Sequence, residues 1–161
     1  MGSSEEKITS SFKLLKDNEE WNLKIYCDDN KLKQQVSQNN AAIDAKRKEI
    51  KELPTGRQFF EKKKIDNLIE SELENEKNRV SDQVHEKLKE YSIHADVKKN
   101  WTKDVTGLKE NMTWNSVYLL PQAKVGSFLE EVKSQETELG DSGLRIEASG
   151  PWPAYHFSNF S

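Results

Sequence analysis

Apolar and polar residues alternate along three short segments of the chain, and this period-two pattern predicts strands with one buried face. The segments are residues 20–27, 92–98 and 144–149. Their alternating apolar residues are Trp21, Leu23, Ile25 and Cys27, then Ile93, Ala95 and Val97, then Leu144, Ile146 and Ala148. Residues 112–120 are instead apolar toward both faces at their end, which is typical of a central strand.

Between the first two predicted strands, apolar residues recur at helical spacing. Residues 29–53 carry one narrow apolar stripe, and the Pro-Thr-Gly sequence at residues 54–56 then ends the helix. A longer helix is predicted over residues 57–91, with Phe60 as the first residue of its apolar stripe. Its centre, residues 74–79, carries no apolar residue, so we expect the middle of this helix to project into solvent or to meet a partner.

A last helix is predicted after Pro121, where Val125, Phe128, Leu129 and Val132 have the spacing of an amphipathic helix. The order of elements is then strand, helical hairpin, strand, strand, helix, strand. This is the order of a ferredoxin-like α+β fold whose first helix is enlarged into a long hairpin at about residues 29–91. Because the outer strands alternate cleanly, we expect an antiparallel sheet that is covered by helices on one face and polar on the other.

The pattern also predicts how the chain is divided. We expect residues 1–19 to be a leader that begins with an expression scar, residues 20–149 to be the α+β domain, and residues 150–161 to be an aromatic, proline-rich C-terminal tail. A single core is expected, formed by Trp21, Leu23, Ile25, Val117, Leu119, Phe128, Leu129, Val132, Leu144 and Ile146.

Composition narrows the class of protein. Hydrophobic residues make up 34% of the 161 residues and charged residues 33%, so the core must be small. No apolar run is longer than the four residues Val117–Leu120, which excludes a membrane-spanning helix. One cysteine and no recognisable secretion signal favour the cytoplasm, and a net charge of -3 argues against a general nucleic-acid binder.

The residues that most often carry catalysis lack their usual companions. His85 has no second histidine at zinc-site spacing, His94 is predicted on the polar sheet face, and His156 lies in the tail. Cys27 is predicted to be a small buried residue without an activating base, and residues 28–30 lack the glycine and glutamate of a calcium loop. With no phosphate-binding glycine motif either, we predict a protein that is not an enzyme and holds no cofactor or metal.

Residues 46–64 form a basic segment, with eight basic and three acidic residues, a local excess of five positive charges. Arg57, Lys62, Lys63 and Lys64 are the candidate partner-binding residues within it. One hypothesis is a helical-hairpin adaptor that binds RNA or an acidic protein through this segment. The alternative is an ordinary solvated face, because the cations are mixed with acids and lack exposed aromatic residues between them.

The C-terminal tail is the second candidate interaction site, through Pro151, Trp152, Pro153, Tyr155 and Phe157. The prolines restrict the backbone, so the rings are presented at a low entropic cost. Two interpretations stay open: the rings fold back onto this domain as a structural clamp, or they hook onto another subunit.

Four segments carry motifs in a fixed order. They are Glu20–Tyr26, Gly56–Phe60 followed by Lys62–Lys64, Asn115–Leu120 followed by Phe128, and Gly-Pro-Trp-Pro-x-Tyr-x-Phe at residues 150–157. Together they resemble the gas vesicle proteins of the GvpF/GvpL family, over about residues 19–157. Ala154 stands where the family usually has a third proline. Family members also carry a preceding ferredoxin-like domain of about 100 residues, whereas only residues 5–19 precede the first strand here. The chain is therefore expected to be either a truncated form or a short paralogue, and the resemblance does not carry over activities that depend on that domain.

The resemblance implies an accessory or minor structural protein of gas vesicle assembly. Such a protein binds the small hydrophobic shell protein GvpA and other accessory Gvp proteins in a chaperone-like role. We therefore expect a cytoplasmic, gas-vesicle-associated protein whose partners are proteins rather than nucleic acid or membrane.

Overall fold

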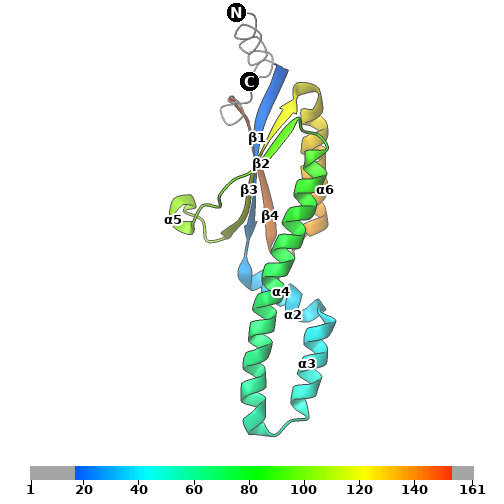
Figure 1. Cartoon of the computed structure of the whole chain (residues 1–161), viewed down its shortest axis with the longest axis vertical. Helices are drawn as coiled ribbons and strands as arrows, with labels where there is room; N and C mark the ends of the chain where they lie inside the picture. The colour runs from blue at the N-terminus through cyan, green and yellow to red at the C-terminus, as the bar shows by residue number, and fades with distance from the viewer. Residues whose placement is uncertain (1–16, 154–161) are drawn as a thin grey trace, which may run out of the picture.

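A computed structural model of the chain describes residues 17–153. This part of the chain forms four strands and five helices, together with one short 3-10 helix (Figure 1). The strands are β1 (Asn18–Cys27), β2 (His94–Val97), β3 (Asn111–Pro121) and β4 (Leu144–Trp152). The helices are α2 (Asp29–Asn39), α3 (Ala41–Lys51), α4 (Thr55–Lys89), α5 (Lys103–Thr106) and α6 (Val125–Leu139), and the 3-10 helix is η1 (Gln122–Lys124).

The strands form one antiparallel sheet in the order β2-β3-β1-β4. The predicted α+β class with an antiparallel sheet is therefore confirmed. β3 is a central strand, as its apolar residues on both faces predicted. Trp21 lies opposite Tyr118 and Ile25 lies opposite Ile146, which places these side chains on one face of the sheet.

The main core lies between this face and the helices. The C-terminal half of α4 and all of α6 run along the sheet (Figure 1). Buried side chains from the strands, α2, α4 and α6 meet there, among them Trp21, Leu23, Ile25, Leu32, Val84, Tyr118, Phe128 and Val132. Phe128 is fully buried, as predicted, but Leu129 is 36% exposed and the prediction that it joins the core was wrong. Leu129 is one step of about 100° around the helix from Phe128, so it faces away from the sheet.

The opposite face of the sheet is less polar than predicted. Val117 and Leu119 alternate with the core residues of β3 and so point to this second face, yet both are fully buried. The connection from β2 to β3 meets this face, because Asn115 Nδ2 donates to the Lys99 carbonyl at 2.9 Å and Lys24 Nζ lies 3.9 Å from the centroid of the Trp101 ring. The expectation of a single core that includes Val117 and Leu119 was therefore wrong.

The segment predicted as one helix over residues 29–53 is two helices. Asn40 adopts an extended backbone conformation between α2 and α3, and its side-chain oxygen accepts hydrogen bonds from Ala42 N at 2.9 Å and Ile43 N at 3.2 Å. These bonds satisfy amide groups that would otherwise be unpaired at the start of α3. α2 packs against the middle of α4, and α3 packs against the N-terminal part of α4, which extends away from the sheet (Figure 1).

The centre of α4 does not project into solvent, contrary to the prediction for residues 74–79. Lys77 is only 8% exposed, and its Nζ lies 3.1 Å from Asp29 Oδ1 and 3.2 Å from Glu74 Oε1. The Asp29 carboxylate compensates the buried charge from the start of α2. The part of α4 that stands away from the sheet is instead its N-terminal part, beside α3 (Figure 1).

Candidate functional site

The α3–α4 turn presents two adjacent aromatic rings. Pro54 is the N-cap residue of α4, and its carbonyl accepts hydrogen bonds from the amides of Arg57 and Gln58. The Gln58 side chain donates to the Leu53 carbonyl at 2.8 Å. The next two residues, Phe59 and Phe60, are 63% and 67% exposed. Their ring centroids are 6.0 Å apart in an edge-to-face arrangement.

Both phenylalanines lie off the buried stripe of α4. Ile65, Ile69 and Leu73 define that stripe, and its continuation toward the N-terminus falls on Gln58, Glu61 and Lys62 rather than on Phe59 or Phe60. The prediction that Phe60 belongs to the apolar stripe was therefore wrong. So was the expectation that the basic segment lacks exposed aromatic residues. The helical phase of Ile65 and Ile69 is the sequence signal that would have placed these rings outside.

Four basic residues lie close in sequence to the two rings on α4. Within residues 17–153, Arg57 and Lys62 make no ion pair, and Lys63 Nζ lies 5.6 Å from the centroid of the Phe59 ring. Lys64 pairs with Glu61 at 3.1 Å, and this pairing lowers the pKa of the Glu61 carboxyl. The predicted residues Arg57, Lys62, Lys63 and Lys64 thus lie in the same first turns of α4 as Phe59 and Phe60. We call these six residues the hairpin-tip surface.

The predicted tail residues lie elsewhere. β4 continues to Trp152, which pairs with Glu20 of β1, so the strand is three residues longer than the alternation predicted. Trp152 is 49% exposed and its Nε1 donates to Ser149 Oγ at 3.3 Å. The start of β1 and the α3–α4 turn are at opposite ends of the molecule (Figure 1), so the described tail residues 150–153 and the hairpin tip are separate surfaces. Tyr155 and Phe157 lie outside the described residues.

The one cysteine is unsuited to nucleophilic chemistry. Cys27 is fully buried on β1, and burial together with the neighbouring Asp29 raises the pKa of its thiol to about 12. A thiolate is therefore strongly disfavoured at neutral pH. In the part of the chain that the structure describes, no three His, Cys, Asp or Glu side chains are placed to hold a metal ion.

A hydrogen-bond network of His85, Tyr118 and Ser116 lies between α4 and the sheet. His85 Nδ1 is 2.6 Å from the Tyr118 hydroxyl, and Ser116 Oγ donates to that hydroxyl oxygen at 3.1 Å. Since the oxygen accepts from Ser116, the hydroxyl proton is available for His85 Nδ1 in its neutral form. Burial is the main cause that lowers the pKa of His85. Tyr118 and Ser116 are fully buried, so this network links α4 to the sheet.

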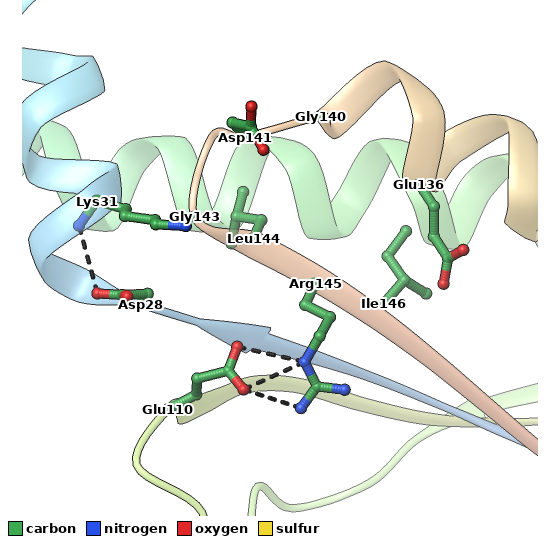
Figure 2. A pocket seen from close by; sticks show the side chains of 10 residues that line it. All are labelled: Asp28, Lys31, Glu110, Glu136, Gly140, Asp141, Gly143, Leu144, Arg145 and Ile146. Atoms are coloured by element: carbon green, nitrogen blue, oxygen red, sulfur yellow. Dashed lines mark hydrogen bonds and ion pairs between the residues drawn. The ribbon is translucent and has the colours of Figure 1, made fainter.

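A charged cleft of about 390 Å³ lies beside the start of β4 (Figure 2). Arg145 projects along it and pairs with Glu110, with Nε to Oε1 at 3.1 Å and Nη2 to Oε1 at 3.0 Å. Arg145 also pairs with Glu147 at 3.3 Å and lies 4.6 Å from the centroid of the Tyr26 ring. The charge of Arg145 is therefore already compensated, and this cleft offers less for a partner than the hairpin-tip surface.

No helix among the described residues combines the length and the apolar character needed to cross a bilayer.

Comparisons with known proteins give one family. The family model described as "Gas vesicle synthesis protein GvpL/GvpF" matches residues 1–159. The crystal structure of the gas vesicle protein GvpF from Anabaena sp. PCC7120 is similar, with a TM-score of 0.70 and 22% identity over 99% of this chain and 62% of that chain. For GvpF from Microcystis aeruginosa the TM-score is 0.63 and the identity 20%, over 98% and 61% of the two chains. At these identities the likeness concerns the fold, and the chain spans about three fifths of the solved chains. No curated protein sequence matches it.

Proposed function

Because the chain belongs to the gas vesicle synthesis protein GvpL/GvpF family, we propose that it is a non-enzymatic accessory or minor structural protein of gas vesicle assembly. In this role it binds the hydrophobic shell protein GvpA and other accessory Gvp proteins, and it limits aggregation of the shell protein before the shell grows. Its place is the cytoplasm, at the gas vesicle. The family match over residues 1–159 is the observation that carries this proposal.

The hairpin-tip surface supports the proposal physically. Two phenylalanine rings that are each more than 60% exposed are unusual on a surface without a partner, and aromatic residues are enriched at the centres of protein interfaces. The rings lie at the end of a hairpin that projects from the sheet (Figure 1), where a partner can approach without contacting the rest of the domain. We propose the tail, through Pro151, Trp152, Pro153, Tyr155 and Phe157, as a second contact.

Co-expression with GvpA followed by pull-down tests the proposal. The double variant Phe59→Ala with Phe60→Ala should lose most of the retained shell protein, because it removes the apolar centre of the surface. The matched control is Ile93→Ala with Leu129→Ala, which also removes two exposed apolar side chains, 47% and 36% exposed, away from the hairpin tip. Retention of GvpA should be unchanged in the control. No association of the unaltered chain with GvpA or any other vesicle protein would refute the proposal.

A second candidate function is an adaptor that binds RNA or an acidic protein through residues 46–64. The observation in its favour is that Phe59 and Phe60 are exposed among cations, since bases stack on aromatic rings beside a basic surface. Titration with a single-stranded RNA at two salt concentrations tests the RNA form, because phosphate contacts weaken steeply with salt. Binding that is absent or independent of salt would exclude it.

A further inference from the structure

A groove runs between α3 and α4, next to the hairpin-tip surface. Its volume is about 520 Å³. Ile50, Ile65 and Ile69 line its apolar part, while Lys51 lines it from α3 and Lys62 from α4. It therefore combines an apolar floor with a cation contributed by each of the two helices.

The apolar floor belongs to a small core within the hairpin. Among the described residues, this core contains four buried side chains, Ile43, Ile50, Ile65 and Ile69. The other half of α4 is covered by the sheet and α6, whereas this half packs against α2 and α3 (Figure 1). Ile50, Ile65 and Ile69 are each 4–6% exposed, so the hairpin leaves only the edges of these side chains open to the groove.

The charges around the groove favour an acidic occupant. Within residues 17–153, Lys51 and Lys62 make no ion pair. Arg47 also lines the groove, but it is held by Ser37, whose carbonyl accepts from Nη1 at 3.2 Å, and by Asp44 at 4.0 Å. Asp66 is the single acid in the lining, against three cations. Phe59 does not line the groove, but it lies one helical turn before Lys62 on the same face of α4, and its ring is 63% exposed.

We propose that the α3–α4 groove binds an acidic amphipathic helix of a partner protein. The apolar stripe of that helix packs on Ile50, Ile65 and Ile69 and against the Phe59 ring. Its flanking carboxylates pair with Lys51 and Lys62, which fixes the orientation of the helix. This inference develops the second candidate function and does not depend on binding of the shell protein.

Two synthetic helical peptides test the inference against the full chain by fluorescence anisotropy. One carries a leucine stripe at positions i, i+4 and i+7 flanked by glutamates, and the other carries the same stripe flanked by lysines. The acidic peptide should bind, and its affinity should fall as salt is raised. The double variant Lys51→Glu with Lys62→Glu should weaken this binding by about tenfold or more and should gain affinity for the basic peptide.

A matched control separates a specific groove from general attraction of charge. Lys31→Glu with Lys87→Glu makes the same change of charge, on α2 and α4, at exposed positions outside both the groove and residues 46–64, and should leave the affinity nearly unchanged. Equal binding of the two peptides, equal effects of the two double variants, or displacement of the peptide from the groove by single-stranded RNA would overturn the inference. A chain that binds the acidic peptide but associates with neither GvpA nor any other vesicle protein would refute the proposed function and leave the groove inference standing.

Discussion

Phe128 is the residue whose removal tests the fold most directly. Its ring is fully buried between α6 and the sheet, with centroid distances of 5.5 Å to Tyr118 and 6.4 Å to Trp21. Tyr118 belongs to β3 and Trp21 to β1, so the substitution Phe128→Ala removes the ring that packs α6 against these two strands. Neighbouring side chains can fill only part of the space, because protein interiors are closely packed.

The expected loss of stability has two parts. Burial of a phenylalanine side chain contributes about 1.5–3 kcal/mol. A residual cavity of roughly 50–80 Å³ adds about 1–2 kcal/mol at about 24 cal/mol per Å³. The sum is about 3–5 kcal/mol, which for a chain of this length lowers the melting temperature by roughly 6–20 °C.

Urea unfolding followed by circular dichroism measures this loss. Leu129→Ala is the control, since Leu129 is the adjacent residue of α6 but is 36% exposed, and we expect it to lose less than about 1.5 kcal/mol. If Phe128→Ala lowers the free energy of unfolding by less than about 1.5 kcal/mol, or if the two variants are equally destabilised, the side of α6 assigned to the core is wrong.

Three further results are expected. Because burial lowers the pKa of His85 below 6.5, the unfolded chain binds the proton more readily, and stability should fall as the pH drops through 6.5; His85→Gln should lose this part of the pH dependence in urea titrations. The Cys27 thiol, with its pKa raised to about 12, should resist iodoacetamide at neutral pH until urea unfolds the chain, whereas rapid labelling of the folded protein would contradict its burial. Deletion of residues 150–161 should lower the melting temperature, since Trp152 pairs with Glu20 in the sheet; an unchanged melting temperature with loss of GvpA binding would instead identify the tail as a hook.

The candidate site was only partly predictable from the sequence. The excess of cations at residues 46–64 is visible in the composition alone, and the structure does gather Arg57, Lys62, Lys63 and Lys64 at one end of the hairpin. The exposure of Phe59 and Phe60 was missed, because a phenylalanine is apolar whichever side of a helix it occupies. The helical phase of Ile65 and Ile69 carries this information, and their packing against α3 shows that their side of the helix is the buried one.

Local periodicity determined most of the elements of this protein, but neither the division of residues 29–53 into α2 and α3 nor the short helix α5. Alternation along β1 and β4 and the apolar spacing of α6 predict these elements because strand and helix geometry repeat within a few residues. The tertiary structure alone decided where the charged centre of α4 lies and how β3, which is apolar on both faces, is covered. Lys77 is buried in a stretch without apolar residues because Asp29, 48 positions earlier in the chain, compensates its charge. Val117 and Leu119 face away from the helices because alternation divides the apolar residues of β3 between the two faces of the sheet, whereas hydrophobicity alone does not assign a residue to either face.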